Sequence, residues 1–591
     1  MKAPRVSSSD RPVRKFGARW SPRFVLLLAV CVLGISAAGF IVRHVYFQRS
    51  RVTDGLHALA VAYRERRPIE ARVSGVPYAP FISQRGARET VDQLSSDLAE
   101  RLLLEAVNEQ STASSRQAMG QFRLLSGSPA KAIVEFEEAL KLDPDNSALH
   151  NDFGVALLEM SRSQAQATES GNTLQYLARS FEQIYLALRL APSNLDAMHN
   201  RALVLQQMRL PEQRNAAWRD YLAHETDARW IAEAKHKLES LSGSDSTRLT
   251  AAGVMDSFLA AAAAQDDERT WQDLTGNQEM ITGSFIPLEL TKSFLSASAS
   301  GNREDAKRLL NALRYAGRLQ LERAHDPFVS QIAEYYAQSS PQQHKLLEAA
   351  HLQLRRGWDS CINAEYNAQI FLDAQKLFRE ARDEWEARIC DYWIAYCLSN
   401  QDKLGKSTEL LNSLAQFSRE RNYQWLLGHA IGWLANNNTD LGEYSKSVNI
   451  YKEAIEITSK TNDLYNQQKF LTQLGNTYLR LGQPERALDY DWRALQIIDF
   501  RVNSVRQTWR VYVYTTRTLI TLQLYEAATQ YGHEMLSLAL KEMNDPAATH
   551  FSYLYLSQIK GGQREFDEAI KFANESLTVA NSVADPANAR K

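Results

Sequence analysis

The residues of this chain that could carry out catalytic chemistry fall into three groups. Gly405-Lys406-Ser407 matches the last three residues of a phosphate-binding loop, but that loop needs a glycine five residues before Gly405, where the chain has Asn400. The twelve histidines are scattered and no HExxH sequence occurs. The cysteines form no CxxC pair, and Cys390 and Cys397 have no histidine base nearby in the sequence. The sequence therefore predicts no catalytic residue, no cofactor and no metal ligand.

A surface that binds a partner protein through its charge is predicted in the C-terminal part of the chain. Arginines recur there among tyrosines and tryptophans, which predicts a positively charged, aromatic surface. Such a surface fits an acidic, extended or helical segment of a partner protein, and the alternative is a basic face in contact with solvent only. The net charge of −1 gives no sign of a nucleic-acid surface, and no small-molecule substrate is predicted. The predicted partner-binding residues are Arg480, Arg486, Arg493, Arg510, Tyr514 and Arg517.

These arginines lie in and after a segment whose pattern predicts two packed helices, GNTYLRLGQPERALDYDWRAL at residues 475–495. Ala487 and Ala494 are seven residues apart, so they share one helix face and let the helix approach its neighbour closely. Gly482 ends the first helix, because a residue without a Cβ tolerates a left-handed backbone. Asp491 departs from the pattern, since its slot is usually aromatic. Together these residues are typical of a tetratricopeptide (TPR) repeat.

One such hairpin cannot bury its apolar face alone, so further copies are expected. The small residue that opens the second helix recurs at intervals of 40 residues and, at the end, of 42. This period is longer than the usual TPR period of about 34 residues, and it predicts longer helices. The fold class is therefore all-α, a solenoid of antiparallel helix hairpins, with residues 357–591 as one continuous array. The recurring residues are Ser407, Ser447, Ala487, Ala527 and Ala569.

A separate group of repeats is predicted earlier in the chain. Residues 113–241 contain a close TPR match, GQFRLLSGSPAKAIVEFEEALKLDPDN, then a second repeat with a polar insertion, a third repeat and a closing helix. Residues 247–356 are expected to be helical without a clear repeat register.

The N-terminal region predicts a membrane anchor. Residues 1–23 are a basic tail, and residues 24–42, FVLLLAVCVLGISAAGFIV, run for 19 residues without a charge, which is enough to cross a bilayer as one helix. Seven Lys and Arg residues precede this segment, so the positive-inside rule places the N-terminus in the cytoplasm and the bulk of the chain outside it. The alternative is a cleaved signal peptide. Residues 43–112 form a helical juxtamembrane region, interrupted by the Pro- and Gly-rich residues 67–81.

The order of these parts resembles one family. A basic tail, an anchor, the segment RPIEARVSGVPYAPF at residues 67–81, a TPR pair with an insertion and a long helical array resemble bacterial TPR proteins that carry a C-terminal CHAT domain, a caspase-like cysteine-peptidase fold. The resemblance covers most of residues 20–400. In that family the catalytic His and Cys lie beyond the repeats, so the resemblance implies no catalytic residue at any position here.

The sequence as a whole favours a membrane-anchored TPR scaffold that binds proteins through a concave solenoid face and is not an enzyme. One alternative is the regulatory N-terminal half of a CHAT-type cysteine peptidase whose catalytic domain is absent from this chain. A second alternative is a cytoplasmic TPR regulator that has no membrane anchor.

Overall fold

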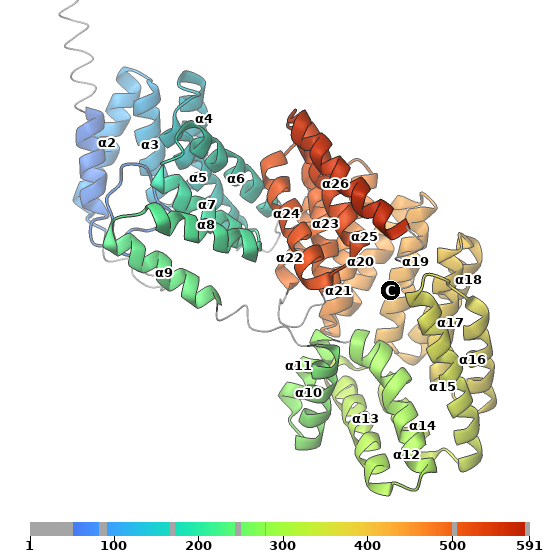
Figure 1. The fold of residues 1–591 in the computed structure, drawn as a ribbon. Helices are drawn as coiled ribbons and strands as arrows, with labels where there is room; N and C mark the ends of the chain where they lie inside the picture. Colours follow the sequence, from blue (N-terminus) through green and yellow to red (C-terminus); the bar gives the residue numbers. More distant parts are fainter. Residues whose placement is uncertain are drawn as a thin grey trace, which may run out of the picture. The chain divides into compact units, whose positions relative to one another are not determined.

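The computed structural model describes residues 51–81, 91–165, 172–242, 250–277, 279–498 and 505–584. Every regular element within these ranges is a helix, which confirms the predicted all-α class (Figure 1). The chain divides into two compact units. The first comprises Met1–Pro68 and Ala79–Pro144, and the second comprises Ile69–Tyr78 and Asp145–Lys591.

The described part of the first unit consists of a helix over residues 51–62, α2 (Gln93–Glu109), α3 (Ala113–Leu125) and α4 (Pro129–Leu142). Helices α3 and α4 form the predicted TPR hairpin. Gly120 allows the two helices to approach closely, because a Cβ at this position would lie 2.5 Å from the ring of Phe136, which is fully buried.

The second unit begins with residues 69–78, which contain no helix, and continues into two hairpins and a closing helix. The predicted first TPR group is therefore divided between the two units, with α3 and α4 in the first and the remaining helices in the second. These helices are α5 (Ser147–Ala165), α6 (Thr173–Leu190), α7 (Leu195–Gln207), α8 (Pro211–His224) and α9 (Ala228–Ser242).

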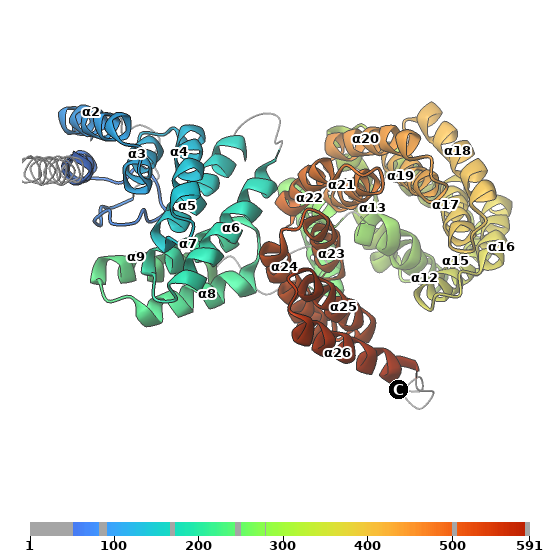
Figure 2. The same cartoon turned by 90° about the horizontal axis from the view of Figure 1, so that it is seen from above.

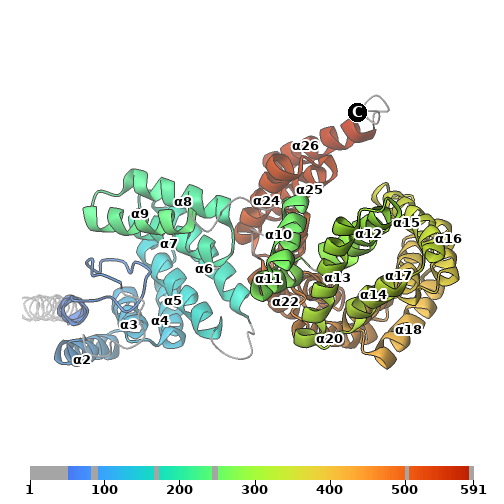
Figure 3. The same ribbon diagram turned by 90° about the horizontal axis from the view of Figure 1, so that it is seen from below.

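The region without a predicted repeat register is also helical, and its later helices follow a curve that leads into the array (Figure 3). The predicted array start at residue 357 falls inside α15. The elements are α10 (Ala251–Ala264), α11 (Asp267–Gly276), the π-helix η1 (Glu279–Leu290), α12 (Thr291–Ala299), α13 (Arg303–Ala324), α14 (Phe328–Gln338) and α15 (Pro341–Ile362), and α16 (Ala368–Glu380) is the first helix that lies wholly within the predicted array.

Five hairpins with the predicted spacing of 40 and finally 42 residues complete the second unit. Ser407, Ser447, Ala487 and Ala527 are fully buried near the start of the second helix of successive hairpins, as the pattern predicts. The helices are α17 (Glu384–Asn400), α18 (Leu404–Arg421), α19 (Gln424–Asp440), α20 (Tyr444–Lys460), α21 (Leu464–Arg480), α22 (Pro484–Ile497), α23 (Val505–Thr521), α24 (Tyr525–Leu538), the π-helix η2 (Ala539–Met543), α25 (Pro546–Gly562) and α26 (Phe566–Ala584).

The turn between α21 and α22 has the predicted backbone, since Gly482 has a φ of 71° in the left-handed region. Asp491 lies fully buried on α22, in the slot that is usually aromatic. Helix α21 approaches it closely, because a Cβ at Gly475 would lie 2.8 Å from Asp491 Oδ1. Burial raises the pKa of Asp491 to about 7, and a 2.8 Å hydrogen bond from Thr518 Oγ1 and the charge of Arg517 oppose this shift only in part.

The Asp491→Asn variant is expected to lose part of the pH dependence of stability. An acid whose pKa is raised on folding stabilises the folded state below its unfolded value of 3.8, and this contribution is lost as the pH rises through about 7. Between about pH 4 and about pH 8 the wild-type chain should therefore lose roughly 1–3 kcal/mol more unfolding free energy than the variant. Urea unfolding at both pH values measures the difference, and Glu485→Gln, at an exposed position of the same helix, is the control. An equal pH dependence in wild type and Asp491→Asn would contradict the expectation.

None of the described helices is both long and apolar enough to span a bilayer. Residues 24–42, which carry the predicted membrane helix, lie outside the described residues.

Candidate partner-binding groove

The groove of the array is formed by the first helix of each hairpin. Figure 2 shows α17, α19 and α21 on the inner side of the curved path and α16, α18 and α20 on the outer side. Together α17, α19, α21, α23 and α25 enclose a cavity of about 550 Å³. A cavity of this size accommodates several side chains of an incoming polypeptide or a small molecule. We call this cavity the array groove.

Aromatic side chains form one wall of the array groove. The rings of Tyr396 on α17 and Trp433 on α19 lie 4.9 Å apart, and the ring of Tyr366 lies 5.9 Å from that of Tyr396. Burial raises the pKa of Tyr396 to about 12, although the nearby charge of Arg510 opposes the shift. The hydroxyl therefore stays protonated at neutral pH and can donate a hydrogen bond to a bound segment.

Three cations line the array groove. Lys469 Nζ lies 5.2 Å from the centre of the Trp433 ring, and the Arg517 guanidinium lies 5.6 Å from that of Tyr514. Arg517 Nη1 also donates to Asn476 Oδ1 at 3.3 Å. Arg510 is exposed. No Asp or Glu is among the described residues that line the groove, so its charge is positive.

Polar atoms without partners lie in the same wall. Gln468 is fully buried and donates from Nε2 to the Ala494 carbonyl at 3.2 Å, but its Oε1 has no hydrogen-bond partner among the described residues. The Trp433 Nε1–H likewise has none there. A buried acceptor or donor without a partner destabilises the folded chain, and these two atoms have almost no accessible surface.

Only some of the predicted partner-binding residues meet at the array groove. Arg510, Tyr514 and Arg517 line it from α23. The other three arginines do not. Arg486 lies over the Tyr478 ring at 5.8 Å and Arg493 over the Tyr490 ring at 5.1 Å, while Arg480 is exposed at the end of α21.

The repeat period itself marks groove positions that charge and aromatic composition alone do not indicate. Trp433, Gln473, Val513 and Tyr555 are spaced by 40, 40 and 42 residues, and all four line the array groove. Lys469, Trp509 and Phe551 form a second such series. Projecting the period from the second helix of each hairpin onto the first would have found them.

The residues considered for catalytic chemistry pack against neighbouring helices. Ser407, at the end of the phosphate-loop pattern, is buried in α18 and donates to the Ala395 carbonyl at 2.8 Å. Cys361 and Cys397 are free thiols whose sulfur atoms lie 3.7 Å apart, a proximity that their sequence separation did not suggest. Burial raises the pKa of the Cys390 thiol well above its ordinary value, which makes this thiol a poor nucleophile.

Comparison with known proteins identifies the repeat type. A tetratricopeptide repeat model matches residues 470–498, which run from within α21 to the residue that follows α22. The chain contains a TPR repeat. Regulatory protein RapG from Bacillus subtilis (strain 168) is 24% identical over 172 residues, and the match spans 28% of this chain and 45% of the length of RapG.

Three solved structures are similar at 12–13% identity. The TPR domain of P58(IPK) matches with a TM-score of 0.20, covering 78% of this chain and 99% of its own. A signal transduction ATPase with numerous domains and a TPR sensor from Pyrococcus horikoshii matches with a TM-score of 0.36, covering 83% and 73%. The Cut9–Hcn1 assembly of APC/C matches with a TM-score of 0.22, covering 82% and 94%. The resemblance to CHAT-domain proteins draws no support from these comparisons.

Proposed function

We propose that this protein is a non-catalytic scaffold that binds an acidic, extended or helical segment of a partner protein in the array groove. The observation that carries the proposal is the composition of the groove wall. Three cations and a row of aromatic rings face one cavity, and no carboxylate is among its described lining residues.

An acidic segment fits the array groove because its charged and its apolar side chains each have a complementary group in the groove wall. Carboxylates pair with Lys469, Arg510 and Arg517, and apolar side chains lie against the aromatic wall. Rigid hairpins hold these groups in place before binding, so little entropy is lost in ordering them.

We also propose where in the cell this protein acts. Residues 24–42 anchor the protein in a membrane, with the N-terminus in the cytoplasm and the groove on the other side. Fusing alkaline phosphatase after Lys591 tests this topology, because the enzyme is active only after export. An inactive fusion, with a fluorescent reporter at the same position that matures in the cytoplasm, would contradict it.

Selection of peptides from a random dodecamer library displayed on phage, with the full-length chain as bait, tests the proposed ligand class. The selected pool should be enriched in Asp and Glu and should contain aromatic or aliphatic residues between them. A pool without acidic enrichment, or one enriched equally by a chain in which Lys469, Arg510 and Arg517 are replaced by Glu, would contradict the proposal.

A further inference from the structure

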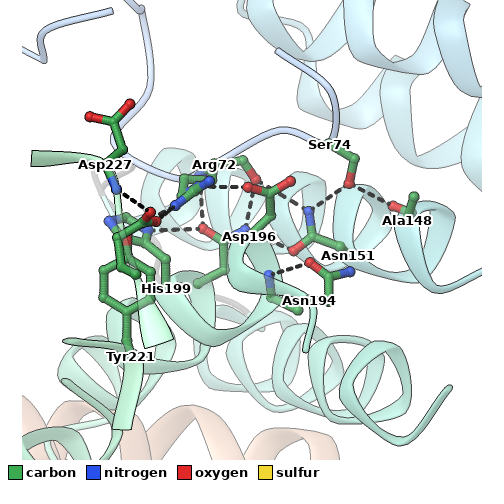
Figure 4. Close-up of polar contacts among 12 residues, drawn as sticks. Arg72, Ser74, Ala148, Asn151, Asn194, Asp196, His199, Tyr221 and Asp227 are labelled. Carbon is green, nitrogen blue, oxygen red and sulfur yellow. Dashed lines mark hydrogen bonds and ion pairs between the residues drawn. The ribbon is translucent and has the colours of Figure 1, made fainter. Parts of the chain in front are cut away.

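A second groove in this molecule is already occupied by the chain itself. Residues 69–78, which we call the internal segment, contact α5 and α7 through Ser74 and Arg72 (Figure 4), and Arg72 also lies over the ring of Trp230 on α9. The segment belongs to the second unit, whereas the chain on both sides of it belongs to the first. It contains no helix, so its main-chain groups are open to side chains of the groove.

Two asparagines bind the main chain of the internal segment. The Asn200 side chain accepts a hydrogen bond from Arg72 N at 2.8 Å and donates one to Arg72 O at 2.7 Å. Asn151 donates to the same carbonyl at 3.2 Å, and Asp152 Oδ1 accepts from Ser74 N at 2.8 Å. These hydrogen bonds are made to main-chain atoms, so they recognise an extended peptide independently of its side chains.

The Arg72 side chain is bound in a pocket of acidic and aromatic side chains. Its guanidinium pairs with Asp196 at 2.6 Å and with Glu225 at 2.5 Å, and donates to Tyr221 Oη at 2.8 Å. The ring of Trp230 lies 4.4 Å from the guanidinium carbon. The Glu225 carboxylate accepts further hydrogen bonds from Tyr221 and two backbone amides, and together with Arg72 these lower its pKa despite burial.

A pocket of the opposite charge lies two residues away along the segment. Glu70 pairs with Arg162 at 2.7 Å and with Lys237, and these cations lower its pKa although burial acts in the opposite direction. The order of a glutamate and then an arginine therefore fixes both the register and the direction of the bound chain.

The groove is built to hold a ligand of this kind. Asn151, Asp152 and Asn200 are fully buried, and each makes a hydrogen bond to the internal segment. The amides also bond to each other, since Asn200 Nδ2 donates to Asn151 Oδ1 at 2.9 Å, and this contact orients both toward the internal segment. Asn151 and Asn200 each follow a histidine in matching parts of α5 and α7, so the repeat presents the same amide twice.

We propose that the inner face of α5, α7 and α9 is a binding site for an extended polypeptide segment with the order Glu-x-Arg-x-Ser, and that the internal segment occupies it as a ligand that a partner segment must displace. The covalent link keeps the internal segment at a high effective concentration, so a free partner segment binds measurably only when the internal one is weakened or outcompeted. This site is independent of the array groove.

A labelled synthetic peptide of residues 67–80, RPIEARVSGVPYAP, titrated into the full-length chain in detergent tests the proposal by fluorescence anisotropy. The variant Glu70→Ala/Arg72→Ala weakens the internal segment and leaves the groove unchanged. It should bind the peptide roughly tenfold or more tightly than wild type. Adding Asn200→Ala, or replacing by alanine the peptide arginine that corresponds to Arg72, should reverse the gain. Equal binding by wild type and variant, or full binding of the peptide with that replacement, would overturn the proposal.

A second measurement needs no substitution and decides the matter if the variant does not fold. In isotope-labelled wild-type chain the amides of Arg72 and Ser74 should exchange slowly with solvent, because both are hydrogen-bonded in the groove. Excess unlabelled peptide should speed their exchange severalfold while α5 and α7 stay protected, and a scrambled peptide should have no effect. Unchanged exchange at saturating peptide would overturn the proposal.

Discussion

Reversing the charge of Arg510 and Arg517 together is expected to weaken the binding of acidic peptides to this protein by at least about 30-fold, because like charges brought together at an interface cost several kcal/mol. Both side chains line the array groove from the same helix, and no described acidic residue in the lining would offset the change. Isothermal titration of the Arg510→Glu/Arg517→Glu chain with a peptide selected on wild type measures the loss.

The matched control reverses two arginines that do not line the groove. Arg480→Glu/Arg486→Glu makes the same change in net charge at exposed positions of the same array. It should leave the affinity within about threefold of wild type, since charges beyond a Debye length of about 8 Å are largely screened at physiological salt. A similar loss in both double variants would mean that peptides respond to overall charge and not to the groove.

The largest expected effect on stability is that of Gly432→Ala. A Cβ at this position of α19 would lie 2.2 Å from ring atoms of Phe470, which is itself buried against the neighbouring helices. The ring has to move out of a packed core, which costs about 2–3 kcal/mol. For a cooperative unit of roughly 150–250 residues this corresponds to a fall of about 5–10 °C in the midpoint of thermal unfolding.

Gly405→Ala is the matched control in the same array. Gly405 lies in α18 with no atom within 4 Å of an added Cβ, so the same methyl group should change stability by no more than about 0.5 kcal/mol or stabilise slightly. Circular dichroism during heating measures both variants. If Gly432→Ala unfolds at the wild-type temperature, the close approach of α19 and α21 at this point is wrong.

The architecture was predictable because the repeat imposes one physical requirement many times. A small residue is needed wherever the second helix of a hairpin crosses the first, and the spacing of Ser407, Ser447, Ala487 and Ala527 records it. Ala569, the last member of the series, is only half-buried. Asp491 breaks the pattern without breaking the fold, since it stays buried and hydrogen-bonded.

The array groove was predictable only in part. Charge and aromatic composition singled out Arg510, Tyr514 and Arg517, which line it, together with arginines that do not. Composition cannot separate the inner helix of a hairpin from the outer one, whereas the repeat register can. The binding of the internal segment was beyond local pattern analysis, because Arg72 meets its partners across more than a hundred residues of chain.

The most direct test of the proposed function is photo-cross-linking from inside the array groove. Tyr514 is replaced by p-benzoylphenylalanine in the full-length chain within its own cells, and the same replacement is made at Arg486, outside the groove. The proposed function predicts a cross-linked partner at position 514 whose attached peptide is acidic, and little or none at position 486. No adduct at 514, or the same adducts from both positions, would contradict it.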